Sequence, residues 1–308
     1  MSTHILEKKF GSIGAKIDFE NPDFRRSYQA YQDRLKLSRE NQKKYPARSL
    51  SSKDIAIPLD LSVDIVKRGR DEVFIIDTIE NKNMDVSVID LRTDIRHLLL
   101  MIKDLTPKHL RNKSKPYITK YLCGHDERHW FVAAVPEDAH VKSVAEAMAA
   151  LKPELAVQSQ AKKGVKKKNR NKRKNKAYIR QGEWFFVPVD IDSEDYPIYK
   201  NEPLSRGRGS KPHFCEELFR KGGTVVYTSG VYAPDGLTQE EYEEYRKEHP
   251  DHFGSRIPWK KMVRDPEAYA RGKVRHTDHK TISLNGWHRI VFNTENKAFA
   301  AKTVVFLD

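Results

Sequence analysis

A run of fifteen residues, Lys162 to Lys176, constrains the fold more than any other stretch of this chain. It reads KKGVKKKNRNKRKNK, contains ten Lys or Arg and no acidic residue, and so carries ten of the net +14 charges of the 308 residues. Its only apolar side chain is Val165. Like charges this close repel one another, and the run has little apolar surface to bury. Nothing in it therefore offsets the conformational entropy that is lost when its backbone is ordered. We therefore predict a solvated, extended tether between two folded regions.

The charge of this tether predicts a polyanionic partner. Nucleic acid phosphates are the natural counterpart, because their neutralisation releases condensed counterions. The cations predicted to contact phosphate are Lys162, Lys163, Lys166, Lys167, Lys168, Arg170, Lys172, Arg173, Lys174 and Lys176. A linker that is basic only to stay soluble and extended is the main alternative. An anionic membrane surface or a targeting signal would also fit, and in a eukaryote such a run resembles a nuclear address.

The composition indicates a soluble protein with modest cores. The chain is 38% hydrophobic and 32% charged, and its length suits two domains. Apolar runs such as 98–102 and 131–135 are too short to span a bilayer. Cys123 and Cys215 are the only cysteines and form no CxxC pair. A reducing compartment is the simplest fit, so we expect a cytoplasmic location, or a nuclear one in a eukaryote.

The pattern of elements predicts an α+β fold with four parts. Residues 1–50 should form an irregular arm and a basic amphipathic helix, 51–157 a small α+β domain, 158–177 the flexible tether, and 178–308 a mainly β domain, sheet or sandwich-like. The helix should begin at Asn21-Pro22, where a cap precedes a first-turn proline. We expect it to dock on the next domain through its apolar stripe. It could instead mediate self-association, or lie along a phosphate backbone.

Within the two domains, local signals predict individual elements. In 51–157 we expect two hairpins, one of Glu72–Ile79 and Asp85–Ile89 and the other of Tyr117–Cys123 and His129–Val135. Between them we expect a helix from Asp90, with Leu91, Ile95, Leu98 and Ile102 on one face. A second helix should begin at the capping box of Ser143 and Glu146. In 178–308 we expect a strand over Glu183–Val189, a helix capped by Thr238 and Glu241, and a type I′ hairpin at Asn285-Gly286.

Two histidine-rich stretches could bind a metal. His125 and His129 flank the polar turn GHDERH, where imidazoles and carboxylates could hold a divalent ion, although a salt-bridged turn explains the same residues. His276, Asp278 and His279 form the second group, and could supply a catalytic or metal site if residues 277–280 make a turn.

The predicted Asn285-Gly286 hairpin would exclude His288 from the second group. Its pairing register would place His279 and His288 four residues apart along one face, or about 13 Å. One zinc ion, with ligands at about 2.1 Å, could not bind both.

Two further features would suit nucleic acid. The glycine-rich loop Ser205–Lys211 offers Arg206, Arg208 and Lys211 for phosphate contact, although a flexible surface loop has the same composition. Tyr178 and the aromatic run 184–186 could stack bases if the rings are exposed, although we favour their burial in the core.

These observations favour a nucleic-acid-binding protein, with RNA mildly preferred. The alternative is a metal-dependent nuclease or phosphoesterase, which alone would require a divalent metal cofactor. A third hypothesis is a structural subunit of a larger assembly, held by the N-terminal helix. The sequence specifies no reaction.

Overall fold

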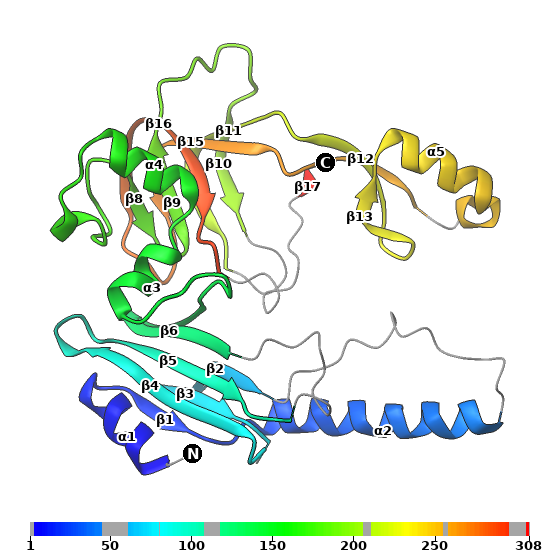
Figure 1. Cartoon of the computed structure of the whole chain (residues 1–308). Helices are drawn as coiled ribbons and strands as arrows, with labels where there is room; N and C mark the ends of the chain where they lie inside the picture. Colours follow the sequence, from blue (N-terminus) through cyan, green and yellow to red (C-terminus); the bar gives the residue numbers. More distant parts are fainter. Residues whose placement is uncertain are drawn as a thin grey trace. The chain divides into compact units, whose positions relative to one another are not determined.

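The computed structural model describes residues 3–44, 61–79, 81–107, 118–205, 211–254, 258–295 and 306–307. Figure 1 shows the chain coloured from its N-terminus to its C-terminus. It divides into two compact units, Met1–Ala150 and Leu151–Asp308. The fold is mixed α+β with an N-terminal helix and a mostly β C-terminal part, which confirms the predicted class. In the described ranges, no helix has the length and apolar character needed to cross a membrane.

The first unit starts with a helix where an irregular arm was predicted. α1 (Thr3–Ser12) buries Leu6 and Phe10, which lie one turn apart on the same face. Phe10 contacts Phe74 at a ring-centroid distance of 5.1 Å. α2 (Pro22–Lys44) begins where the cap predicted it, because the Phe24 backbone N–H donates to Asn21 Oδ1 at 3.2 Å.

Two sheets and a short helix complete the first unit. The three-stranded sheet has the order β1 (Lys16–Asp18), β3 (Asp71–Asp77) and β2 (Ser62–Arg68), with β1 parallel to β3. The four-stranded sheet runs in chain order through β4 (Met84–Arg92), β5 (His97–Asp104), β6 (Ile118–Asp126) and β7 (His129–Ala134), with the 3₁₀ turn η1 (Thr93–Ile95) before β5. α3 (Val144–Ala150) starts at the predicted cap, where the Glu146 N–H donates to Ser143 Oγ at 3.2 Å. One apolar core takes side chains from α1 and both sheets.

Two predictions for this unit are wrong. The helix expected from Asp90 does not form, because Leu91 lies in β4, Ile95 in η1, and Leu98 and Ile102 in β5. Residues 98–100 of β5 are all 0% exposed. A strand buried on both faces is a continuous apolar run, and periodicity alone does not separate it from a helix. The hairpin expected from Glu72–Ile79 and Asp85–Ile89 does not form either, because β3 and β4 belong to different sheets. The second predicted hairpin is confirmed as the antiparallel pair β6 and β7.

The second unit is built on a six-stranded and a four-stranded sheet. In spatial order the larger contains β10 (Tyr199–Leu204), β11 (His213–Lys221), β15 (Glu267–Arg275), β16 (Ile282–Phe292), β9 (Trp184–Pro188) and β8 (Ile179–Gln181). The smaller contains β13 (Ala233–Leu237), β12 (Thr224–Ser229), β14 (Lys260–Arg264) and β17 (Phe306–Leu307). The helices are α4 (Glu154–Lys162), η2 (Lys167–Asn169), α5 (Gln239–Glu248) and η3 (Pro250–Phe253). The predicted capping box of Thr238 and Glu241 opens α5.

The hairpin predicted at Asn285-Gly286 is also wrong, because both residues lie inside the continuous strand β16. Ala270 pairs with His288 and Gly272 with Leu284, so β16 has two more residues than β15 in that interval. The chain absorbs them in a bulge, where Gly286 takes a φ of +75°. The connection that turns the chain is instead the segment 276–281 between β15 and β16.

Candidate functional site

The tract Lys162–Lys176, which we call the lysine knob, is folded where an extended tether was predicted. α4 ends inside it with Gly164 in the left-handed region, at a φ of +58°. The Gly164 N–H donates to Ala161 O at 3.1 Å, and the Val165 N–H donates to Gln160 O at 3.0 Å. This pair of hydrogen bonds is a Schellman motif, which uses a glycine to end a helix and satisfy its last carbonyls.

The single apolar side chain of the knob is buried. Val165 is only 5% exposed and belongs to a core cluster with Ala156, Tyr178 and Phe185. Two of these partners follow the knob in sequence and one precedes it. The knob therefore packs against the segments that precede and follow it in the sequence, and its fold depends on residues outside Lys162–Lys176.

Hydrogen bonds fix the backbone in the middle of the knob. The Arg170 carbonyl accepts from Gln160 Nε2 at 2.6 Å and from Tyr178 Oη at 2.8 Å. Arg170 Nε donates to Val165 O at 3.1 Å. Buried Lys152 donates to Asn171 Oδ1 at 2.5 Å, and burial, with the nearby positive charges of Arg170 and Arg180, lowers the pKa of Lys152 to about 8. The Arg170 carbonyl and the Asn171 side-chain oxygen, in the interior of the knob, are thus both hydrogen-bonded.

The outer surface of the knob is cationic. All eight lysines of the tract are exposed: Lys162, Lys163, Lys166, Lys167, Lys168, Lys172, Lys174 and Lys176. Among the residues that the structure describes, none of the eight forms an ion pair with an acidic group. Arg170 is exposed as well, and Arg173 is half-buried. The nearby surface has a hollow of about 440 Å³, lined by Gly164, Val165, Lys166, Lys168, Asn169, Lys172, Lys174, Asn175 and Lys176.

The other residues predicted to meet nucleic acid are placed differently. Arg206 and Arg208 lie outside the described residues. Lys211 Nζ donates to the two carboxylate oxygens of Asp278 at 2.9 and 2.7 Å, so its charge has a partner. Tyr178 and the aromatic run 184–186 are buried, which confirms the favoured interpretation of these rings as core and excludes them as a stacking platform.

The structure gives His125 and His129 separate surroundings. His125 pairs with Trp130 across the β6–β7 hairpin and His129 pairs with Asp126, which places the two histidines on opposite faces. The ring of His125 packs edge-on against Trp130, and burial, aided by the positive charge of Arg96, lowers its pKa. His129 Nδ1 lies 2.6 Å from Glu72 Oε1.

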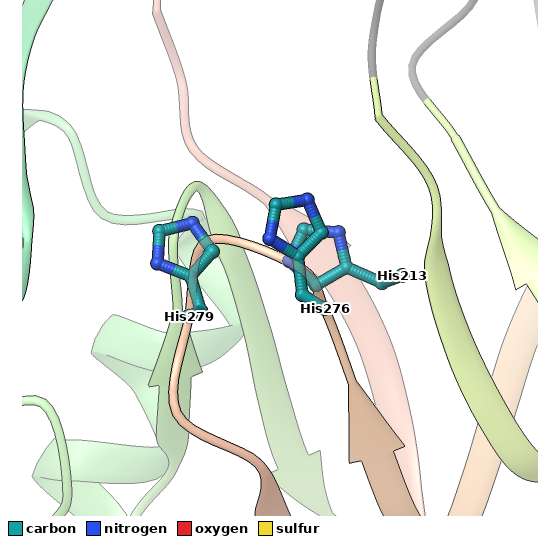
Figure 2. Close-up of side chains that lie close together, drawn as sticks. All are labelled: His213, His276 and His279. Atoms are coloured by element: carbon teal, nitrogen blue, oxygen red, sulfur yellow. The ribbon is translucent and has the colours of Figure 1, made fainter.

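The second histidine group is brought together, with a third member that the sequence reasoning missed. Phe214 pairs with Arg275, so His213 at the start of β11 lies beside His276 at the end of β15 (Figure 2). The ring centroids are 4.1 Å apart for His213 and His276, and 4.7 Å apart for His276 and His279. We call these three residues the histidine cluster. Because Asp278 pairs with Lys211, it is not counted among them.

His213 offers the histidine cluster an uncharged nitrogen ligand. His213 is 2% exposed, and burial, with the neighbouring charges of His276 and His279, lowers its pKa to about 3. One ligand nitrogen from each of the three residues lies within 4.8 Å of the others. Among the described residues, this is the only such group of three or more potential metal ligands. A neutral imidazole is the form that coordinates a metal ion.

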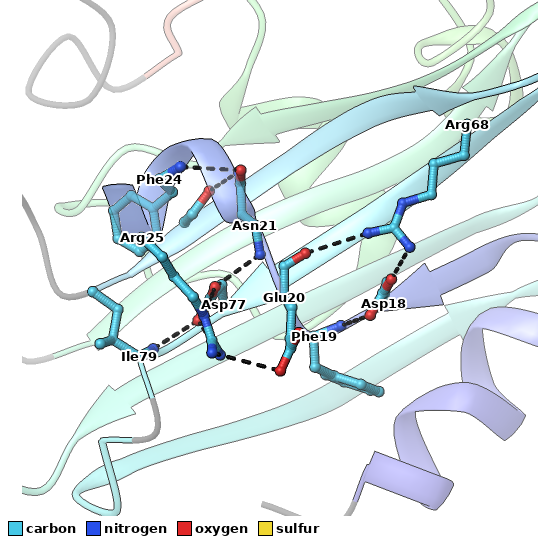
Figure 3. Close-up of polar contacts among 10 residues, drawn as sticks. Asp18, Phe19, Glu20, Asn21, Phe24, Arg25, Arg68, Asp77 and Ile79 are labelled. Carbon is cyan, nitrogen blue, oxygen red and sulfur yellow. Dashed lines mark hydrogen bonds and ion pairs between the residues drawn. The ribbon is translucent and has the colours of Figure 1, made fainter. Parts of the chain in front are cut away.

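The start of α2, the helix predicted to dock on the next domain, is attached to β3 by the buried carboxylate of Asp77 (Figure 3). Asp77 accepts from the backbone N–H groups of Asn21 and Ile79, each at 2.8 Å, and from Arg25 Nε at 2.7 Å. Burial raises the pKa of Asp77, but these hydrogen bonds outweigh it and the net shift is downward. Self-association or phosphate contact through α2 stays a prediction.

No protein-family model, curated protein or solved structure matches this chain.

Proposed function

We propose that the protein binds nucleic acid, with RNA preferred, through the lysine knob. The observation that carries this proposal is the set of eight exposed lysines on a hydrogen-bonded backbone, none of which forms an ion pair with an acidic group in the described part of the chain. Phosphate groups would neutralise these charges and release counterions, which is the main source of sequence-independent affinity for nucleic acid. A cytoplasmic location, or a nuclear one in a eukaryote, belongs to the same proposal.

A folded knob suits this role better than a flexible tether of the same composition. A disordered segment loses backbone entropy when it binds, whereas the backbone here is already held by Gln160, Tyr178 and the Schellman motif. The ammonium groups stay on rotatable stems and can adjust to phosphates. The knob should therefore bind phosphates at a limited set of positions.

RNA is favoured over duplex DNA by the local shape of the knob. Lys167 and Lys168 lie on the short 3₁₀ turn η2, and Lys172, Lys174 and Lys176 follow it. Neither a long helix nor a β-ribbon in the knob carries them, and these are the elements that enter a B-DNA major groove. Lysines arranged around a hollow suit the irregular phosphates of loops and bulges, where proteins usually recognise RNA.

The first test compares two variants of equal net charge. One variant changes Lys166, Lys168, Lys172 and Lys174 in the knob to Gln. The control changes four exposed lysines elsewhere to Gln: Lys67, Lys82, Lys247 and Lys260. Fluorescence anisotropy would measure the affinity of each variant and the wild-type protein for single-stranded RNA, single-stranded DNA and duplex DNA at one low salt concentration.

We expect the knob variant to bind RNA at least about tenfold more weakly than the wild-type protein, and the control variant to stay within about twofold. Circular dichroism would check that both variants are folded. Equal weakening in the two variants would mean that overall charge, and not the knob, determines binding. A tighter complex with duplex DNA than with RNA would contradict the preference for RNA.

A further inference from the structure

We propose that His213, His276 and His279 form a Zn²⁺ site with three imidazole ligands and a fourth position open to water. This site is separate from the lysine knob and does not depend on nucleic acid binding. Zn²⁺ is commonly held by imidazole nitrogens, and a site with three protein ligands keeps one position for water or a substrate.

The ligand atoms are already close to the required spacing. Two nitrogens bound to one tetrahedral Zn²⁺ at about 2.1 Å are about 3.4 Å apart. The three ligand nitrogens here lie within 4.8 Å of one another. Side-chain rotations that move each nitrogen by about 1 Å would therefore be enough to bring them around one ion.

The surroundings of His213 are those expected of a metal ligand. Within the described part of the chain, neither ring nitrogen of His213 has a hydrogen-bond partner, although the side chain is buried. Buried polar atoms are nearly always paired, so an unpaired buried imidazole needs a specific explanation. Its nearest aromatic neighbours include His276 and His279, with ring centroids at 4.1 and 5.8 Å. A bound cation among the three rings would supply the missing partner.

His276 makes two longer hydrogen bonds, one of which a metal would replace. Its Nδ1 accepts from the Asp278 N–H at 3.1 Å, and its Nε2 lies 3.3 Å from Lys211 O. If Nδ1 binds the ion in place of the Asp278 N–H, Nε2 carries the proton and can keep donating to Lys211 O. A metal-bound histidine usually has such a hydrogen bond at its second nitrogen, which orients the ring.

The loop that carries His276 and His279 is held in place by β8. Gln181 is fully buried, and its Nε2 donates to Lys280 O at 2.7 Å and to Val274 O at 3.4 Å, which fixes both ends of the loop. Gly182 has a φ of +57°, and a Cβ there would lie 2.9 Å from His279 Nε2. A larger residue at 182 would strain the backbone and crowd the ligand, so Gln181 and Gly182 act as positioning residues.

The chemistry of the site selects the metal and leaves it accessible. Three imidazoles without a thiolate suit Zn²⁺ and neighbouring transition metals, whereas Mg²⁺ and Ca²⁺ prefer oxygen ligands. His276 and His279 are only half-buried, so solvent reaches the cluster from their side. Water is therefore the expected fourth ligand.

The test uses the full chain without a histidine tag, stripped of metal and titrated with Zn²⁺ by calorimetry. We expect one Zn²⁺ per chain. The variants His276→Ala and His279→Ala should each weaken binding by at least about 100-fold, because removing a ligand costs more than removing a residue that orients it. Co²⁺ should give the strong visible absorption of a tetrahedral complex in the wild-type protein and lose it in both variants.

His4→Ala is the matched control, because His4 is highly exposed and its loss removes one imidazole without touching the cluster. Zn²⁺ affinity of this variant should equal that of the wild-type protein. His213→Ala changes a buried residue, so the two half-buried ligands decide the test, with circular dichroism to confirm their folding. Equal zinc affinity in the wild-type protein and both variants, or no zinc uptake by the wild-type protein, would overturn the proposal.

Discussion

The lysine knob and the histidine cluster belong to the same unit but differ in which of their polar groups are buried and which are hydrogen-bonded. In the knob, the Arg170 carbonyl is paired inside and the lysine charges are outside. In the cluster, the uncharged imidazole of His213 is buried and lacks a hydrogen-bond partner among the described residues. Exposed like charges suit a large polyanion, whereas buried lone pairs suit a single small cation. The chemistry of a site thus follows from where its polar atoms lie as much as from which residues supply them.

The largest expected effect tests whether the knob is folded at all. Val165→Asp places a carboxylate in an apolar cluster and should lower the free energy of unfolding by about 3 kcal/mol or more. Urea unfolding would measure the change. Val157→Asp is the matched control on α4, where Val157 is 47% exposed, and should cost less than about 1 kcal/mol. Two equal small effects would indicate an extended tether.

The next largest effect is the stabilisation of the protein by Zn²⁺ bound to the histidine cluster. Zn²⁺ at 100 times its dissociation constant should raise the free energy of unfolding of the wild-type protein by about 2.7 kcal/mol, because it binds the folded state. His279→Ala should lose this stabilisation at the same zinc concentration. Thermal unfolding with and without the metal would measure it. An equal rise in both proteins would place the zinc outside the histidine cluster.

A smaller effect is expected from one hydrogen bond inside the knob. Tyr178→Phe removes the hydroxyl that donates to the Arg170 carbonyl and should cost about 1 kcal/mol. Tyr199→Phe, at a residue that is 45% exposed, should change stability by less than about 0.5 kcal/mol. Urea unfolding of the two variants side by side gives the comparison. If Tyr178→Phe is as mild as its control, the interior of the knob is not held as described.

The smallest expected effect is the change in stability with pH that comes from Asp77. Its buried carboxylate is hydrogen-bonded, whereas the buried imidazole of His213 has no hydrogen-bond partner among the described residues. Because the folded pKa of Asp77 is lowered, its stabilising effect is present above its ordinary unfolded pKa of about 3.9 and is lost as the pH falls through the folded value. Stability of the first unit should therefore decline between about pH 5 and pH 2.

The change Asp77→Asn should flatten this decline. Asp71→Asn removes an exposed carboxylate paired with Lys16 and serves as the control. Urea unfolding at a series of pH values would measure both. A decline as steep in Asp77→Asn as in the wild-type protein would show that other groups govern the acid sensitivity.

The parts of the fold that could be predicted from the sequence have local signals. Asn21-Pro22 marks the start of α2, Thr238 and Glu241 cap α5, and the turn of GHDERH joins β6 to β7. Each signal lies within a few residues of the structure that it specifies, so one sequence is enough to recognise it.

The parts that could not be predicted depend on distant contacts. Leu98 and Ile102 follow helical spacing but lie in a strand. Leu98, Leu100 and Ile102 face the core that α1 and both sheets share, and Leu99 is buried on the opposite face of the strand. The knob folds because Tyr178 and Gln160 pair with it, which its own composition does not reveal. His213 joins His276 only through the pairing of β11 with β15, and no sequence spacing indicates that pairing.

The most direct test of the central claim is the salt dependence of RNA binding by the knob variant and its control, each with four lysines changed to Gln. On single strands, each lost lysine–phosphate contact should reduce the slope of log affinity against log salt by about 0.7. We predict that the knob variant has a slope shallower by up to about 3, while the control keeps the wild-type slope. Identical slopes in the two variants would show that the lysine knob does not contact phosphate, and would contradict the account.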